Sequence, residues 1–122
     1  MKHLISLSYD LSFQGNYAEL YKWLDANKAL ECGDSYCRFV YDFKSVETIE
    51  SEDDTRAMVK EIRDDLISSV KFGANDRVYI MADFYVKGKI QMAGLFLIGK
   101  RKQENPWDGA SGQIDFQQEL DS

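Results

Sequence analysis

Residues 5–17 read ISLSYDLSFQGNY, and this stretch contains the first strand, the first turn and the start of the first helix. Ile5, Leu7 and Tyr9 alternate with polar side chains, which is the period of a strand with one buried face. The last polar position of this strand is Asp10. The stretch therefore predicts a half-buried strand that ends in a carboxylate.

The helix that follows is predicted from its cap and its apolar spacing. Asn16 is followed three residues later by Glu19, which is the spacing of a capping box. Apolar residues then recur at helical intervals. We expect a helix from near Asn16 to about Lys28.

Two hairpins are predicted from paired extended segments. Residues 29–32 and 36–43 flank a glycine and an aspartate, and the longer segment alternates in the manner of a strand. Residues 77–85 are rich in Val, Tyr, Ile and Phe, and a Lys-Gly pair separates them from an apolar segment over 89–98. Each pair of segments predicts two antiparallel strands.

A second helix lies between the two hairpins. Ser51 and Asp54 have the spacing of a capping box, and an apolar stripe follows them. Lys71 and Gly73 suggest a basic last turn and a left-handed stop at the C-terminal end. This helix is therefore expected to begin at Ser51 and to end just before Gly73.

The order of these elements predicts the fold class. The pattern is β-α-β-β-α-β plus an additional C-terminal strand, which is the ferredoxin-like α+β plan with two helices on one face of an antiparallel sheet. We expect one domain over residues 1–102. Residues 103–122 form an acidic tail that is loosely ordered or docks through Trp107, Ile114 and Phe116.

Composition limits the class of protein. The chain has 122 residues, of which 44% are hydrophobic, enough for a single core. It contains no apolar run that could span a bilayer, so a cytoplasmic protein without a membrane partner is expected. Cys32 and Cys37 match neither a zinc site nor a disulfide framework, and we expect them to be reduced packing residues.

Charge is unevenly distributed along the chain. The formal net charge is -6, and the tail contributes five acidic residues and no Lys or Arg, so the remainder is nearly neutral. Lys87, Lys89 and the run Lys100-Arg101-Lys102 could present a basic strip to phosphates. The same side chains could instead solvate a strand edge and protect it from aggregation.

Several motifs together resemble a known family. The chain is similar to the CRISPR-associated protein 2 superfamily, including its virulence-associated protein D relatives, over roughly residues 1–100. The matching pieces are Tyr9-Asp10-Leu11-Ser12 with Gly15, the helix Tyr17 to Leu24, the pair Asp34-Ser35, and Asn75-Asp76-Arg77-Val78-Tyr79-Ile80.

The resemblance implies a homodimer with a shared metal site. In active members of the family, the strand-end aspartate of each protomer meets its mate across the two-fold axis and helps to hold a divalent ion for phosphodiester hydrolysis. Asp10 is the matching position, as catalytic residue and ligand of Mg²⁺. The alternative is that Asp10 only bonds backbone amides in the turn that follows the strand.

Other residues are candidates for binding a substrate. They are Tyr9, Ser12, Ser35, Lys100, Arg101 and Lys102. The serine hydroxyls could position phosphate or water, or they could serve as local backbone partners. The ring of Tyr9 could stack on a base if it is exposed, or belong to the core.

Three functions remain open from the sequence. The first is a small dimeric nuclease, an Mg²⁺-dependent endonuclease that acts on RNA or DNA through paired Asp10 residues. The second is a dimeric module without catalytic activity that binds a nucleic acid or a protein partner. The third is an inhibitor or regulator whose acidic tail imitates nucleic acid.

Overall fold

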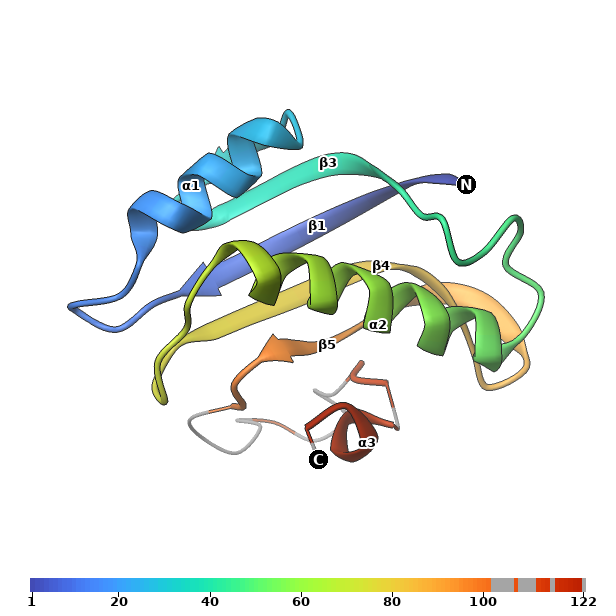
Figure 1. The fold of residues 1–122 in the computed structure, drawn as a ribbon. Helices are drawn as coiled ribbons and strands as arrows, with labels where there is room; N and C mark the ends of the chain where they lie inside the picture. Colours follow the sequence, from blue (N-terminus) through green and yellow to red (C-terminus); the bar gives the residue numbers. More distant parts are fainter. Residues whose placement is uncertain (102–106, 108–111, 115, 122) are drawn as a thin grey trace.

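The structure is a computed structural model, and it describes residues 1–101, 107, 112–114 and 116–121. The protein is an α+β chain with a five-stranded antiparallel sheet in the order β2-β3-β1-β4-β5 (Figure 1). None of its described helices is long and apolar enough to cross a membrane. The elements are β1 (Lys2–Asp10), α1 (Tyr17–Ala26), β2 (Leu30–Gly33), β3 (Tyr36–Asp42), α2 (Glu52–Ser69), β4 (Arg77–Val86), β5 (Lys89–Ile98) and α3 (Gln117–Asp121).

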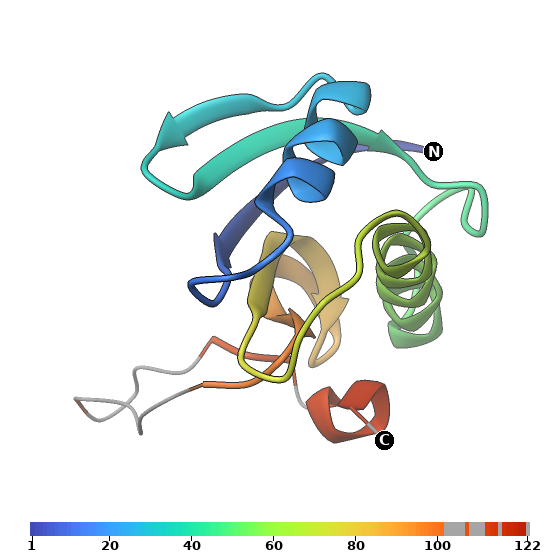
Figure 2. The same cartoon turned by 60° about the vertical axis from the view of Figure 1, so that its left-hand side comes forward.

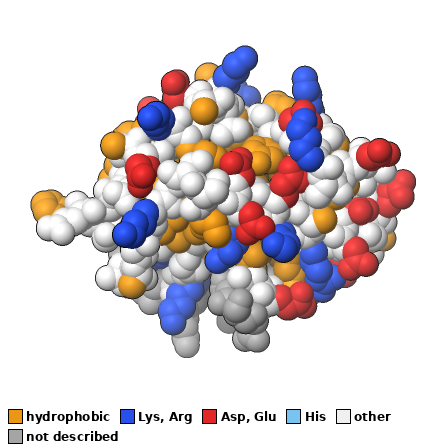
Figure 3. Space-filling model, in the orientation of Figure 1, with side chains coloured by type: hydrophobic (Ala, Val, Ile, Leu, Met, Phe, Trp, Pro, Cys, Tyr) orange, Lys and Arg blue, Asp and Glu red, His pale blue; other side chains and the backbone are white. Residues whose placement is uncertain are grey.

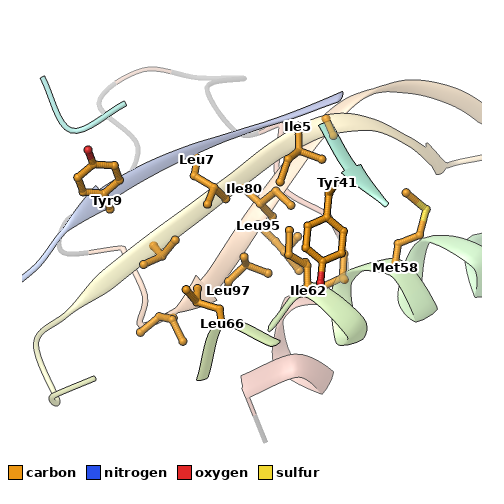
Figure 4. Close-up of a cluster of buried hydrophobic side chains, with 14 of the residues drawn as sticks. Ile5, Leu7, Tyr9, Tyr41, Met58, Ile62, Leu66, Ile80, Leu95 and Leu97 are labelled. Atoms are coloured by element: carbon orange, nitrogen blue, oxygen red, sulfur yellow. The ribbon is translucent and has the colours of Figure 1, made fainter. Parts of the chain in front are cut away.

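One face of the sheet carries α1 and α2, and the core lies between these two layers (Figures 1 and 2). Ile5 and Leu7 of β1 are buried beneath the helices, whereas Leu4, which points to the other face, is 55% exposed. The predicted alternation of β1 is thus confirmed. Figure 4 shows how side chains of the helices and strands interlock in this core. They include Ile5, Leu7, Ile62, Leu66, Ile80, Leu95 and Leu97.

The N-terminus of α1 differs from the expected capping box. Asn16 is the N-cap residue, but its side chain makes no capping hydrogen bond. Its amide instead donates to the carbonyl oxygen of Lys71, and Glu19 accepts from the Lys71 N–H at 3.2 Å. The prediction of a capping box at Asn16 is therefore wrong, because the side chains of Asn16 and Glu19 bond instead to the segment between α2 and β4.

The N-terminus of α2 agrees with the prediction, and its C-terminus does not. Ser51 and Asp54 form the expected capping box. The helix ends at Ser69, and Val70 leaves it in an extended conformation with φ at −128°. Val70 is buried, so packing draws the chain out of the helix. Gly73 is not in the left-handed region, and no basic residue lies in the last turn, so that part of the prediction is wrong.

The two cysteines lie in different environments. Cys37 is buried on β3, and burial raises the pKa of its thiol to about 11. Cys32 on β2 is exposed. Neither forms a disulfide, so packing accounts for Cys37 and not for Cys32.

The described part of the tail returns along the outer edge of β5. Gln113 pairs with Gly94 in a parallel bridge, and Ile114 is buried in the same core as the strands. The side-chain amide of Gln117 accepts from the N–H of Phe96 at 2.7 Å and donates to its carbonyl oxygen at 2.8 Å. The tail thereby satisfies backbone groups that an edge strand would otherwise leave open.

The short helix α3 rests on α2. Phe116 is buried at its start, and the guanidinium of Arg56 lies 4.9 Å from the centre of the Phe116 ring. Arg56 also pairs with Glu119 at 3.2 Å. Ile114 and Phe116 are thus docked, whereas Trp107 is 66% exposed.

Candidate nucleic-acid interface

An open groove of about 860 Å³ crosses one end of the sheet, where β1 and β5 end and β4 begins. Four cationic side chains and two carboxylates line it, so its formal charge is positive in a chain whose net charge is -6. These charged residues are Asp10, Arg63, Asp76, Arg77, Lys100 and Arg101.

The register of the sheet brings Asp10 and Arg77 together. They are directly opposite each other in the β1–β4 pair, and the guanidinium Nη2 of Arg77 donates to the Asp10 carboxylate. The Asp10 side chain is 62% exposed and that of Arg77 is 14% exposed. The Nε of Arg77 is buried and has no hydrogen-bond partner among the described residues. This guanidinium therefore keeps donor capacity beyond the pair with Asp10.

Asp76 holds the walls of the groove in place. Its buried carboxylate accepts from the N–H of Ser12 at 2.7 Å and from the N–H of Gly73 at 2.7 Å. Burial acts to raise the pKa of Asp76, but the hydrogen bonds from Gly73 and Ser12 outweigh it, so this pKa lies below its ordinary value. The carboxylate thus joins the β1–α1 loop to the α2–β4 loop.

Gly99 sets the course of the basic segment that follows β5. Its φ is +75°, and a Cβ atom on it would lie 2.3 Å from the carbonyl oxygen of Asp76. Only glycine combines this conformation with so close an approach. The tight packing places Lys100 and Arg101 on the groove and leaves both side chains exposed.

Arg63 reaches the groove from the helical layer. It lies on α2, and its Nε donates to the carbonyl oxygen of Leu97 on β5 at 3.0 Å. This hydrogen bond fixes the position of a second guanidinium at the same end of the sheet as Arg77. The cations of the groove therefore come from α2, from β4 and from the segment after β5.

The structure brings together four of the residues singled out from the sequence. They are Asp10, Ser12, Lys100 and Arg101, and all of them line the groove. Ser12 lines the groove, and its backbone N–H donates a hydrogen bond to the Asp76 carboxylate. Lys102, the third member of the basic run, lies outside the described residues.

Tyr9 and Ser35 are not among the residues that line the groove. Tyr9 is buried and packs edge-to-face on Tyr21, with ring centres 6.3 Å apart. Ser35 lies in the β2–β3 turn with φ at +58°, and its carbonyl oxygen accepts from the Tyr9 N–H at 3.0 Å. Both residues therefore have roles in packing and in the turn.

Sequence reasoning missed Arg63, Arg77 and Phe13 as groove residues. Opposite charges at facing positions of an antiparallel pair would have suggested Arg77, had the strand register been known. To predict Arg63 as a groove residue, the orientation of α2 on the sheet would have to be known. To predict Phe13 as a groove residue, the geometry of its loop would have to be known, since an apolar residue next to a strand is more often buried.

Asp10 alone does not constitute a magnesium site. Among the described residues, no group of three or more His, Cys, Asp or Glu side chains is placed to hold a metal ion. The carboxylate of Asp10 is in addition paired with Arg77. A site at Asp10 would thus need further oxygen ligands from a second chain or from a bound phosphate.

The tail has one described acidic side chain with an assigned partner, Glu119, which pairs with Arg56. Arg56 is not among the groove residues. The other tail acids are Glu104, Asp108 and Asp115, which lie outside the described residues, and Asp121 in α3.

Comparison of the chain with protein-family models, with curated proteins and with solved structures gave no match.

Proposed function

We propose that the groove binds the phosphate backbone of RNA or DNA, and that the protein is a nucleic-acid-binding module. The observation that carries the proposal is the convergence of Arg63, Arg77, Lys100 and Arg101 on one groove. Guanidinium groups match phosphate oxygens in geometry and stay charged at all physiological pH values. Two of these cations are held by contacts with Asp10 and Leu97, which limits the entropy lost on binding.

Asp10 moderates the charge of the groove in this proposal. Its carboxylate is paired with Arg77, so a phosphate that approached Arg77 would be repelled by the negative charge of Asp10. Replacing Asp10 with asparagine would remove that repulsion and keep the size of the side chain. We therefore expect Asp10→Asn to strengthen binding, with the largest effect at low salt.

The test measures binding of a fluorescein-labelled oligonucleotide in EDTA across a series of salt concentrations. Arg101→Ala and Lys100→Ala should each weaken binding and lower the slope of log affinity against log salt by about 1. Lys89→Ala is the matched control, because Lys89 is exposed at the opposite end of β5. Equal losses in Lys89→Ala and Arg101→Ala would contradict the proposal.

A metal-dependent nuclease is the second candidate. It is favoured by the exposure of Asp10 beside the cationic groove, where a second protomer could supply another carboxylate. In that case Asp10→Asn abolishes cleavage in Mg²⁺, and EDTA abolishes cleavage by the unmodified chain. Cleavage that persists in Asp10→Asn would remove this residue from the mechanism. The two candidates are separable, since only the second predicts cleavage in Mg²⁺ that Asp10→Asn abolishes.

We infer further that the fold is ferredoxin-like and related to the CRISPR-associated protein 2 superfamily. The strand order β2-β3-β1-β4 supports this inference, with α1 and α2 connecting strands on one face of the sheet. The motifs in the sequence support the relationship to the family. An experimental structure with another strand order would contradict the fold.

A homodimer is also proposed, through the open face of the sheet. Leu4 and Val40 are directly opposite each other on β1 and β3, and each is 55% exposed. Met92 on β5 is 69% exposed, and it lies opposite Asp83 of β4. Apolar side chains on an uncovered face are typical of a surface buried by a partner. Sedimentation should give twice the chain mass, and the double variant Leu4→Lys with Val40→Lys should sediment as a monomer.

A further inference from the structure

Phe13 is the most exposed large apolar side chain described in the chain, with a relative exposure of 101%. It lies in the loop between β1 and α1, and it lines the same groove as Asp10 and the four cations. In Figure 3, a hydrophobic side chain stands out from the end of the molecule where this loop lies in Figure 1. A phenylalanine in this position contributes nothing to the core.

The loop around Phe13 is held on both sides. Before it, the Leu11 N–H donates to the Tyr17 hydroxyl at 3.1 Å, and the Ser12 N–H donates to Asp76. After it, the Gly15 N–H donates back to the Ser12 carbonyl oxygen at 2.7 Å. These bonds keep the turn closed, so the ring is presented outward by a defined backbone and little order must be gained when a ligand binds.

An aromatic ring beside a cationic groove is the arrangement that suits single-stranded nucleic acid. Its phosphates follow the cations, and its unpaired bases offer faces that can stack on a ring. In a duplex those faces are already stacked on neighbouring base pairs. A duplex would therefore use the cations and gain nothing from Phe13.

We propose that the protein prefers single strands to duplexes, and that one unpaired base stacks on the ring of Phe13 while the flanking phosphates contact Arg77, Lys100 and Arg101. The proposal rests on the function proposed above and names its substrate class. It assigns the phosphate contacts to cations of the groove and the base contact to Phe13, which lines the same groove.

The test compares a labelled single strand of about 12 nucleotides with the same strand annealed to its complement, both in EDTA. We expect the single strand to bind more tightly to the unmodified chain. Phe13→Ala should weaken single-strand binding by about 5-fold to 150-fold, the loss expected for one stacked base, and leave duplex binding nearly unchanged. Phe13→Tyr should retain the preference, because it keeps an aromatic face.

Ile90→Ala is the control, since Ile90 is 54% exposed at the far end of the sheet. Phe13 and Ile90 are both exposed, so neither variant is expected to unfold the protein. Equal affinity for single strand and duplex, or an unchanged affinity in Phe13→Ala, would overturn the inference. If Arg101→Ala still weakened binding to both probes in that case, the proposal of a phosphate-binding groove would remain supported although the inference about Phe13 had failed. Absence of binding to either probe would overturn the proposed function together with the inference.

Discussion

The groove has two acidic residues whose surroundings are opposite. Asp76, on the inner wall, is 2% exposed and accepts hydrogen bonds from two backbone N–H groups. Asp10, on the outer rim, has a side chain that is 62% exposed and paired with Arg77. The Asp76 carboxylate is bound to two loops of its own chain. The Asp10 carboxylate is accessible to a ligand.

The difference shows how one residue type divides between structure and recognition. Backbone amides cannot change their charge or move far, so a carboxylate bound to them becomes part of the scaffold. A guanidinium at the surface can exchange its carboxylate for a phosphate. Four variants or conditions test this contrast.

Asp76→Ala should cause the largest loss of stability. It leaves the N–H groups of Ser12 and Gly73 without their acceptor, and we expect the free energy of unfolding to fall by about 3 kcal/mol. Urea unfolding followed by circular dichroism measures the loss. Asp10→Ala is the matched control and should cost less than about 1 kcal/mol. Similar losses in both variants would mean that the wall and the rim are not distinct.

Gly99→Ala should be the next most destabilising change, at about 2 kcal/mol. The new Cβ would meet the carbonyl oxygen of Asp76 in a backbone conformation that disfavours side chains. Gly88→Ala is its control, because Gly88 has φ at +82° but nothing lies within 4 Å of the added atom. If the two variants lose equal stability, the contact with Asp76 adds no constraint of its own.

Acid should remove the contribution of the Asp76 carboxylate to stability. In the unfolded chain this carboxyl titrates near its ordinary pKa of 3.8, and in the folded chain its pKa is lower. The unfolded state therefore binds the proton first, so the stabilisation is complete well above pH 3.8 and is lost as pH falls through the folded-state pKa. The stability gap between the unmodified chain and Asp76→Asn should narrow from about pH 6 to about pH 2. A gap that stays constant over this range would refute the assignment.

The pair of Asp10 and Arg77 should make the smallest contribution. A double-mutant cycle with Asp10→Asn and Arg77→Gln is expected to give a coupling energy between about 0.2 and 1 kcal/mol, because one partner is exposed to water. The coupling should shrink as salt is added. A value as large as the loss in Asp76→Ala would place Asp10 in the scaffold as well.

Much of the fold was predictable because it depends on local patterns. The alternation of β1, the two hairpins and the capping box of Ser51 and Asp54 are properties of residues that are close in sequence. The errors at Asn16 and Gly73 have another origin. Asn16 finds its partner on Lys71, 55 residues along the chain, and α2 ends where Val70 turns into the core; neither depends on a local pattern.

The candidate site divides in the same way. Asp10, Lys100 and Arg101 could be named because they end a strand or form a charged run. Arg77 is sequence-distant from Asp10 and meets it only through the β1–β4 register. Its importance becomes evident when that register is known, since the alternation of β1 specifies which face Asp10 occupies but not which residue faces it.

The amide of Gln117 has a consequence for the behaviour of a shortened chain. It mimics a strand residue toward Phe96, while Gly94 bonds to the backbone at Gly112 and Ile114. Cleavage of the chain before Gly112 would uncover a row of amide and carbonyl groups on β5, ready to pair with the same row on another molecule. Residues 112–114 and Gln117 thus protect this edge of the sheet from pairing with a second molecule.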